Sequence, residues 1–444
     1  MTHLDRLLTF LRFPSISTAS QHAGDVKACA DWLAAELRDL TLATEVHPTA
    51  GHPIVVARNA HRAGRPTVLL YGHYDVQPVD PLALWLSPPF DPTIRDGVIF
   101  ARGSTDNKGQ LMAHVCGLRE TLNRDGGLPV NLICLFEGEE EIGSPNLAPF
   151  LAQHRDALAC DLVAISDTGM VGPGQPTFTY GLRGIACLEI TLTGPSVDLH
   201  SGIFGGAVAN PATEIARLVS KVHDADGRVQ IPGFYDTVRP IAEWERAAWA
   251  AIPGGPEETL ALTGSPKLHG ETGFTDFERR WARPTAEVNG IGGGYQGEGS
   301  KTVIPSKSFA KFSFRLVPDQ DPADISAKAA AFFQSVCPDT VKIDIHVGHS
   351  GQPYVCDPHS KHGQAAQRAL SAAFDGKKPA LIREGGSIPI VHDFKRVLGV
   401  DTLLLGLALP DCQAHAPNEN FPISNFEAGI RLNQALLAEL GRLS

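Results

Sequence analysis

The sequence predicts an α/β protein with a mainly parallel sheet, helices on both faces of that sheet, and a smaller α+β domain inserted into the chain. Three observations support this prediction. Strand-like apolar runs alternate with helical segments over residues 1 to about 180. Near Gly181 the order changes to β-α-β-β-α-β, and the earlier pattern returns from about residue 353. The 444 residues also exceed the length at which one core stops growing, so two domains are expected.

The first part of the chain contains the segments that define the parallel sheet. An amphipathic helix is expected at the start, where Asp5 and Arg6 interrupt the apolar residues. Short apolar runs, typical of buried strands, then alternate with segments of helical spacing. In order, we expect a helix at 25–40, a strand at 66–71, a helix at 107–122, a strand at 130–136, a helix at 145–154 and a strand at 161–165.

The inserted segment has the split βαβ order of a small, ferredoxin-like domain. Its expected elements are strands at 185–192, 287–291, 309–316 and 341–346 and helices at 210–222 and 322–336. A stretch rich in Pro, Gly and Trp, residues 229–284, is expected to be irregular. The α/β pattern resumes with a helix at 360–374, a strand at 402–407 and a final helix at 425–440. We therefore assign residues 1–181 and 353–444 to a discontinuous first domain and 182–352 to the insert.

Composition narrows the class of protein. The net charge of −11 and a pI near 5.8 argue against a nucleic-acid or anionic membrane partner, since those surfaces need clustered Lys and Arg. No apolar run approaches the ~20 residues of a membrane span, and the first residues do not resemble a signal peptide. Eight scattered cysteines without a CxxC pair are typical of a reducing compartment. We expect a cytoplasmic protein.

Potential metal ligands follow five strand-like runs, at the edge of a parallel sheet where binding sites form. They are His73 and Asp75, Asp106, the acidic run Glu137 to Glu141, Asp167 and His415. Any one of them could be a turn or capping residue; Asp106 could cap the helix that follows it. Two imidazoles and three carboxylates without a thiolate suit two Zn²⁺ or Mn²⁺ ions that share a bridging carboxylate. Asp75, two residues from His73, is expected to hydrogen-bond that ring.

Several motifs resemble the signature of one dinuclear zinc metallopeptidase family. In the first domain these are Gly72 to Asp75, Gly103 to Gly109, Glu137 to Ser144, Ser166-Asp167 and Ala414 to Glu419. The family includes carnosinase, cytosolic nonspecific dipeptidase, carboxypeptidase G and the acetylornithine and succinyl-diaminopimelate deacylases. Further matches lie at residues 198–206, 301–305, 314–318 and 383–389, and they most resemble the carnosinase and nonspecific dipeptidase branch.

The resemblance implies a metal-binding role for each strand-end residue. Asp106 would bridge two divalent ions, with His73 and Asp167 completing one site and Glu141 and His415 the other. Zn²⁺ is the expected metal, with Mn²⁺ and Co²⁺ as alternatives.

The resemblance also implies a general base, Glu140. In the family a Glu pair is followed by one residue and Gly-Ser, which makes the pair Glu140 and Glu141 and leaves Glu139 outside it. A cis peptide bond is implied between Asp106 and Asn107.

Residues of the insert and of the 383–389 motif would bind substrate. His200 would donate to the oxyanion from the partner subunit, which implies a homodimer formed through an insert that also acts as a lid; the alternative is a solvated loop histidine. Arg315 would bind the terminal carboxylate of the substrate, or else face solvent. Glu384 would hold an ammonium group, Thr302 would assist the oxyanion, and Ser387 lies in a Gly-rich segment that could approach a ligand or form a turn.

The predicted function is metal-dependent hydrolysis of dipeptides or short peptides. One alternative is an amidohydrolase that removes an acyl group from an N-acyl amino acid. The other is a metal-stabilised peptide-binding protein without turnover, which the presence of Glu140 beside Glu141 disfavours.

Overall fold

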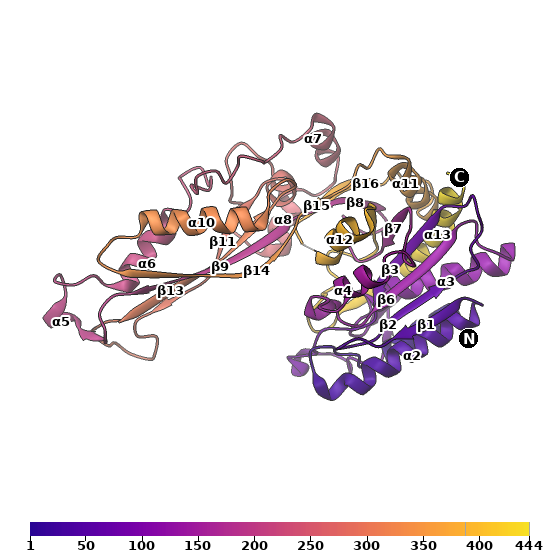
Figure 1. Ribbon diagram of the computed structural model, residues 1–444, viewed down its shortest axis with the longest axis horizontal. Helices are drawn as coiled ribbons and strands as arrows, with labels where there is room; N and C mark the ends of the chain where they lie inside the picture. The colour runs from indigo at the N-terminus through magenta and orange to yellow at the C-terminus, as the bar shows by residue number, and fades with distance from the viewer. Residues whose placement is uncertain (387, 444) are drawn as a thin grey trace. The chain divides into compact units, whose positions relative to one another are not determined.

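The computed structural model describes residues 1–386 and 388–443 and divides into two units (Figure 1). The first unit comprises Met1–Tyr180, Cys356–Ile382 and Pro389–Ser444, and the second comprises Gly181–Val355 and Arg383–Ile388. The boundaries expected at 181/182 and 352/353 lie close to these. One segment was assigned wrongly, because Arg383–Ile388 belongs to the second unit. Backbone hydrogen bonding explains this: the amide of Arg183 donates to the carbonyl of Glu384 at 3.1 Å.

A mixed sheet forms the centre of the first unit. Its four middle strands, β6, β3, β7 and β17, are parallel to one another, as the sequence predicts. The strands on either side are antiparallel, which the sequence analysis did not anticipate. The order is β1-β2-β6-β3-β7-β17-β8-β15, with β16 beside β8; the strands are β1 Ala43–His47, β2 Ile54–Arg58, β3 Thr67–His73, β6 Asn131–Glu137, β7 Leu162–Ile165, β8 Thr177–Leu182, β15 Tyr354–Val355, β16 Ala380–Glu384 and β17 Thr402–Gly406.

Helices flank both faces of this sheet. In Figure 1, α4 and α12 lie on the other side of the strands from α3 and α13, as predicted. Almost all residues of strands β3, β6, β7 and β17 are buried, which explains why these strands have continuous apolar sequences. The helices are α1 His3–Leu11, α2 Ala23–Asp39, α3 Lys108–Asp125, α4 Leu147–Gln153, α11 Lys361–Ala373, α12 Pro389–Asp393 and α13 Ile423–Gly441.

A small three-stranded sheet holds two loops of the first unit together. β18 (Asn420–Pro422) pairs with β5 (Val98–Phe100), which in turn pairs with β4 (Thr93–Arg95). Because β18 follows His415 and β5 precedes Asp106, this pairing brings together two segments that are more than 300 residues apart in the sequence.

The second unit has the predicted β-α-β-β-α-β order around an antiparallel sheet, β11-β13-β9-β14. Along its strands buried residues alternate with partly exposed ones, as in β9. The buried face of the sheet packs with α6 and α10 into a core that contains Leu188, Phe312 and Phe333. The opposite face carries polar residues such as Arg315. The elements are β9 Gly184–Thr193, α6 Pro211–Ser220, β11 Thr285–Gly293, β13 Lys307–Leu316, α10 Pro322–Val336 and β14 Lys342–Gly351, with the short pair β10 Leu199–His200 and β12 Val303–Ile304 and the single-turn helix α5 Ser201–Phe204.

The expectation of an irregular stretch at 229–284 is wrong. It contains three short helices, α7 Glu243–Ala250, α8 Pro256–Thr263 and α9 Asp276–Trp281. Such short helices depend on caps and packing more than on propensity. A capping box joins Thr275 and Glu278 at the start of α9, and the Trp281 ring meets that of Trp249 at 5.5 Å.

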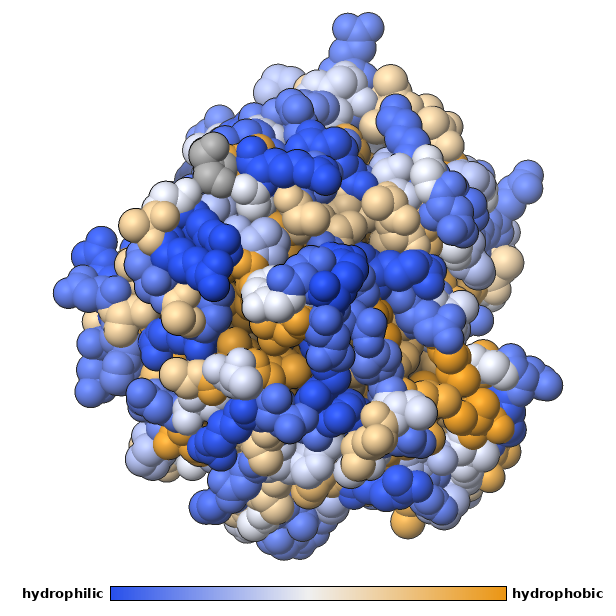
Figure 2. Space-filling view, turned by 90° about the vertical axis from the view of Figure 1, so that its right-hand side faces the viewer, coloured by the Kyte–Doolittle hydropathy of each residue, from blue (hydrophilic) through white to orange (hydrophobic). Residues whose placement is uncertain are grey.

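Three further observations bear on the expectations from composition. No helix among the described residues is long and apolar enough to cross a membrane. Hydrophilic residues cover much of the face shown in Figure 2, with apolar areas between them. The structure describes all eight cysteines and shows none of them in a disulfide bond. Five are buried in the first unit, namely Cys29, Cys116, Cys134, Cys356 and Cys412.

Candidate metal centre

The carboxyl ends of the parallel strands converge on one edge of the sheet. His73 ends β3 and lies beside Glu137, which ends β6. Asp167 follows two residues after the end of β7, which pairs with β3 on its other side. The remaining candidates, Asp106 and His415, lie on loops that precede α3 and follow β17. Parallel pairing therefore sets the position of the first ligands, and the loops bring the others to them.

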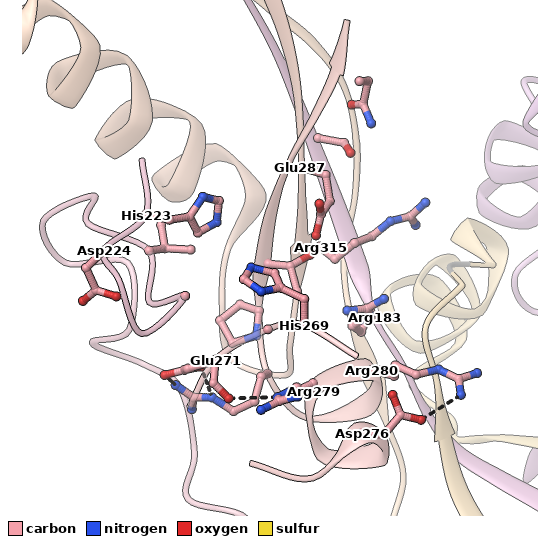
Figure 3. A pocket seen from close by; sticks show the side chains of 18 residues that line it. Arg183, His223, Asp224, His269, Glu271, Asp276, Arg279, Arg280, Glu287 and Arg315 are labelled. Atoms are coloured by element: carbon pink, nitrogen blue, oxygen red, sulfur yellow. Dashed lines mark hydrogen bonds and ion pairs between the residues drawn. The ribbon is translucent and has the colours of Figure 1, made fainter. Parts of the chain in front are cut away.

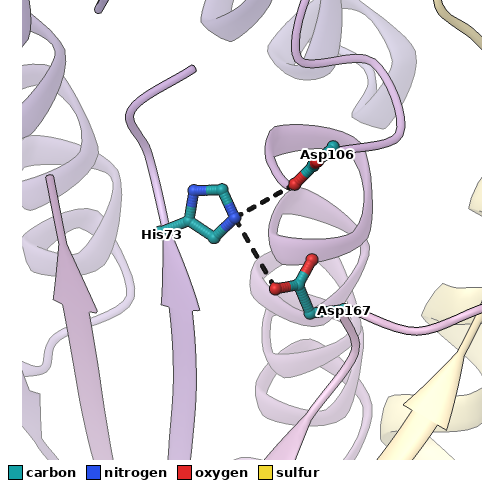
Figure 4. A group of neighbouring side chains, drawn as sticks. All are labelled: His73, Asp106 and Asp167. Atoms are coloured by element: carbon teal, nitrogen blue, oxygen red, sulfur yellow. Dashed lines mark ion pairs between the residues drawn. The ribbon is translucent and has the colours of Figure 1, made fainter. Parts of the chain in front are cut away.

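Asp106 faces two separate groups of side chains, one with each carboxylate oxygen. Its Oδ1 lies 3.2 Å from His73 Nε2, and Asp167 Oδ2 lies 3.6 Å from the same nitrogen (Figure 4). Its Oδ2 lies 2.8 Å from His415 Nε2, which is 3.3 Å from Glu141 Oε2. The structure thus brings together all five predicted ligands, in two groups that share Asp106, and the donor atoms of each group lie within 4.8 Å of one another.

The chemistry of both groups fits divalent cations. The side chain of His73 is completely buried, and its Nε2 has no hydrogen-bond partner among the described residues although two carboxylates face it. A buried ring nitrogen in this position suits a metal ion, because buried polar atoms otherwise find a partner. Carboxylate and imidazole donors without a thiolate suit Zn²⁺, Mn²⁺ or Co²⁺. The N-cap of α3 is Asn107, so Asp106 does not have the capping role that was its alternative.

Asp75 lies behind His73, as expected from the two-residue spacing. Its Oδ1 is 3.3 Å from His73 Nδ1, and its carboxylate accepts hydrogen bonds from the amides of Glu140 and Glu141 at 3.3 and 3.1 Å. Asp75 therefore orients the imidazole and also fixes the turn that carries the acidic pair.

The three glutamates in a row, Glu139 to Glu141, have different surroundings. Glu139 is buried and accepts hydrogen bonds from Asn146 Nδ2 and from the amide of His52, so it anchors the loop. Glu141 faces His415 and also accepts from Gln77 Nε2 at 2.7 Å. Glu140 lies outside both groups. Without a bound cation, burial raises the pKa of Glu140 well above the usual value, and the negative charges of Asp167 and Asp106 raise it further, whereas the nearby His73 lowers it. These environments support the predicted register.

His415 occupies an unusual backbone conformation. Its φ of 61° is in the left-handed region, which few non-glycine residues adopt, and its side chain is 56% exposed. Hydrogen bonds to Asp106 and then to Glu141 raise the pKa of His415 to about 10 in the absence of a cation. The imidazole is therefore held at the surface of the site by the same carboxylates with which it would share an ion.

Asn107 and His114 support Asp167, a role that sequence reasoning missed. Asn107 Nδ2 donates to Asp167 Oδ1 at 2.7 Å and to the carbonyl of Ser166 at 2.6 Å, which leaves Asp167 Oδ2 facing His73. The Asp106–Asn107 peptide bond is cis, as the family resemblance implied. His114 Nε2 lies 2.7 Å from Ser166 Oγ, within hydrogen-bonding distance. Burial lowers the pKa of His114 to about 4.

Glu419 organises the loop that carries Asp106 and was also missed. It is fully buried and paired with Arg102, whose Nη1 donates at 2.8 Å. The amides of Gly103, Thr105 and Asp106 donate to its two oxygens at 2.8, 2.8 and 3.0 Å. A glutamate at the end of the Ala414 to Glu419 motif was the available signal, but only the β18–β5 pairing shows which loop it holds.

The predicted substrate-binding residues lie in the second unit. His200 and Thr302 come together because β10 pairs with β12, and the amide of Ser201 donates to the carbonyl of Thr302 at 3.1 Å. His200 is exposed, and its Nδ1 accepts from the amide of Gly202 at 2.9 Å. Arg315 and Glu384 are partly buried. Ser387 lies outside the described residues.

Comparison with known proteins decides the family. The sequence model of Peptidase family M20/M25/M40 matches residues 69–439 of this chain. The chain belongs to this family. The match covers both units and every predicted ligand of the metal centre, so the M20/M25/M40 family resemblance expected from the motifs is confirmed.

Relatives of this M20/M25/M40-family chain include several named dipeptidases. The Cys-Gly metallodipeptidase of Candida albicans is 35% identical over 96% of the chain and 92% of the relative. The Beta-Ala-His dipeptidase of Mus musculus is 31% identical over 88% of the chain and 80% of the relative. These relatives confirm the predicted carnosinase and dipeptidase branch.

Solved structures agree with the fold over the whole chain. An M20-family metallo-carboxypeptidase from Sulfolobus solfataricus has a TM-score of 0.87 at 33% identity, and the match covers 100% of both chains. Human carnosine dipeptidase 1 has a TM-score of 0.82 at 27% identity, covering 99% of this chain and 96% of that one. The mixed α/β architecture is therefore that of the family.

Proposed function

We propose that this M20/M25/M40-family peptidase hydrolyses dipeptides and other short peptides at a centre of two divalent metal ions. The observation that carries the proposal is the position of Asp106, whose two oxygens face two separate groups of imidazole and carboxylate donors. The dipeptidase names of its relatives support the substrate class.

In the proposed centre, Asp106 would contribute one carboxylate oxygen to each of the two ions. His73 and Asp167 would complete one site and Glu141 and His415 the other. Zn²⁺ is the proposed metal, and Mn²⁺ or Co²⁺ would suit the same donors. When bound, the ions would lower the pKa of a water molecule and polarise the scissile carbonyl.

Glu140 would act as the general base. Its position beside both groups, together with a pKa raised by burial, suits a carboxylate that accepts a proton during the reaction and then releases it. The oxygen of the attacking water would bond to the carbonyl carbon while Glu140 takes its proton. Glu140 would then deliver that proton to the nitrogen as the C–N bond breaks. Asp75 would keep His73 in the orientation that this geometry needs.

The second unit would complete the site from a partner subunit. His200 would donate to the oxyanion, assisted by Thr302. Exposed apolar side chains surround this segment, namely Val197, Ile203, Phe204 and Val208, and Ile203 is 70% exposed. Apolar residues grouped in this way favour contact with another protein surface, which supports the proposed homodimer. The cytoplasmic location remains a prediction.

Arg315 and Glu384 would bind the two ends of the peptide. The guanidinium group of Arg315 suits a terminal carboxylate, and the carboxylate of Glu384 suits an ammonium group.

A substrate panel tests the proposal. The enzyme loaded with Zn²⁺ or Mn²⁺ is offered dipeptides, including Cys-Gly, together with N-acylated amino acids and folyl-glutamates. We expect hydrolysis of dipeptides with free termini. Turnover of acylated amino acids alone would favour the amidohydrolase alternative, and no turnover with both ions bound would favour the peptide-binding alternative.

Two variants test the assignment of the base. Glu140→Ala is expected to retain both ions and lose essentially all activity. Glu139→Gln is the matched control, since Glu139 anchors the loop through Asn146 and His52; we expect it to lower stability but keep measurable turnover. Normal turnover by Glu140→Ala would mean that the base, or the register of the three glutamates, is assigned wrongly.

A further inference from the structure

A cavity of about 630 Å³ lies entirely within the second unit, at one end of its antiparallel sheet (Figure 3). Thr285, Glu287, Ser313 and Arg315 line it from the sheet face opposite the helices. The stretch 229–284, which matches no motif with a known role, supplies much of the remaining wall, together with His223, Asp224 and Gly227. Five arginines line this cavity: Arg183, Arg279, Arg280, Arg283 and Arg315.

Three of these arginines already have partners. Arg283 forms two hydrogen bonds with the Glu271 carboxylate, at 2.7 and 2.8 Å. Arg280 pairs with Asp276 at 3.3 Å, the contact drawn as a dashed line in Figure 3, and Arg279 donates to the carbonyl of Glu271 at 2.8 Å. The positive charges of Arg280 and Arg283 are thus offset within the cavity wall.

Arg183 and Arg315 differ from the others. Among the residues that the structure describes, neither has a carboxylate oxygen within 4.0 Å. Arg183 is partly buried and donates from Nε only to a carbonyl, that of Gly385, at 3.3 Å. Burial, and then the positive charge of Arg315, lower the pKa of Arg183 to about 10, while the charge of Glu287 acts in the opposite sense. Partly buried cations that repel each other favour an anionic partner.

The backbone keeps Arg183 in place. Its amide donates to the carbonyl of Glu384, and its side chain packs closely on Gly385, where a Cβ atom would lie 2.8 Å from Arg183 Nη2. Arg315 is held on β13 opposite Thr285 of β11 and Ile185 of β9. Paired backbone segments therefore place both residues at the cavity, and the Arg183 side chain also contacts Gly385, which suits a preformed binding site.

We propose that Arg183 and Arg315 together form an oxyanion site for the carboxylate or phosphate group of a small molecule, with Arg183 as the member that the sequence analysis did not identify. Two planar guanidinium groups match the oxygens of either anion. The anion could be the terminal carboxylate of the substrate or a free inorganic ion. The first source rests on the proposed function, whereas the second does not.

Binding of inorganic phosphate to the metal-loaded enzyme is the first measurement, made by titration calorimetry. Arg183→Gln is expected to weaken this binding by about tenfold to a hundredfold, the usual loss for a charge-assisted hydrogen bond. Arg280→Gln is the matched control, because this arginine lines the same cavity but is paired with Asp276; its phosphate affinity should stay within about twofold of wild type. Arg183→Lys keeps the charge and should restore part of the affinity.

Kinetics distinguish the two sources. If the substrate carboxylate is the ligand, Arg183→Gln raises the KM for a dipeptide about tenfold or more but leaves the KM for its C-terminal amide unchanged, and phosphate competes with the dipeptide. If a free anion is the ligand, Arg183→Gln weakens phosphate binding without changing either KM. The inference is overturned if Arg183→Gln matches Arg280→Gln in both phosphate affinity and KM. Phosphate binding without dipeptide turnover would leave this site standing while contradicting the proposed function.

Discussion

Replacing Glu419 with glutamine tests how the fold holds the loop that carries Asp106. Glu419 is completely buried and Arg102 is 1% exposed. The carboxylate accepts four hydrogen bonds, from Arg102 and from the amides of Gly103, Thr105 and Asp106. A glutamine keeps one acceptor oxygen and brings an NH₂ group towards donors at the other, so two of the four bonds are lost and Arg102 loses its counter-charge.

The expected cost follows from that geometry. Removing one partner of a buried ion pair destabilises a protein by about 3–5 kcal/mol, because the other charge stays buried without compensation. We expect Glu419→Gln to lower the free energy of unfolding of the metal-free protein by about this amount, measured from urea unfolding followed by circular dichroism. The loop would also hold Asp106 less rigidly, so the affinity for both ions should fall.

Glu439→Gln provides the control. Glu439 pairs with Arg368 and Arg442, whose side chains are 51% and 71% exposed, so its loss should cost less than about 1 kcal/mol. If Glu419→Gln were no more destabilising than Glu439→Gln, Glu419 would not organise the Gly103 to Asp106 loop as described.

Three other predictions concern protons and the support of the ligands. Hydrogen bonds, first to Asp106 and then to Glu141, raise the pKa of His415 to about 10, whereas a metal ion binds the neutral imidazole. Cation binding near pH 7.5 should therefore release a proton, and the affinity for the cation should rise with pH up to about 10. Calorimetry in buffers of different ionisation enthalpy measures this proton release. Asn107→Ala removes the hydrogen bond to Asp167 and should weaken the binding of one of the two ions by about 10–100-fold, measured by competition with a chelator. Burial lowers the pKa of His114 to about 4, so on acidification this histidine is protonated in the unfolded chain at a higher pH than in the folded protein. The free energy of unfolding should therefore fall by up to about 3 kcal/mol as the pH drops from 6.5 to 4. His114→Gln should remove this part of the pH dependence.

The sequence predicted which side chains the structure brings together as candidate metal ligands, because several of them follow strands whose pairing is simple. A buried parallel strand shows itself as a continuous apolar run, and its carboxyl end is where a ligand is expected, as with His73 and Asp167. Asp106 and His415 lie on loops, so their position came from motif resemblance and not from periodicity. The structure places both beside the strand-end residues.

The supporting residues could not be predicted in the same way. Glu419 and Asn107 act through hydrogen bonds to backbone or side-chain atoms of segments that are distant in the sequence, and nothing in their local pattern names those partners. The same applies to Arg383–Ile388, which belongs to the second unit. Its contacts there include the hydrogen bond from the Arg183 amide to Glu384 and the ion pair between Arg383 and Glu245. Tertiary contacts decide such assignments.

Local signals for the short helices of 229–284 were present but weak. Thr275 and Glu278 have the spacing of a capping box, and Pro256 begins α8 while Gly264 ends it. Each helix is too short for a clear apolar period, so Pro, Gly and Trp dominated the pattern.

The metal content of three proteins tests the central claim most directly. Mass spectrometry of the ions bound to the purified wild type, to His415→Ala and to Asp106→Ala should find two, one and none per chain. Among the residues that the structure describes, Asp106 alone faces both groups. A zinc or manganese content of one ion per chain in Asp106→Ala, equal to that of His415→Ala, would contradict a centre in which Asp106 bridges both ions.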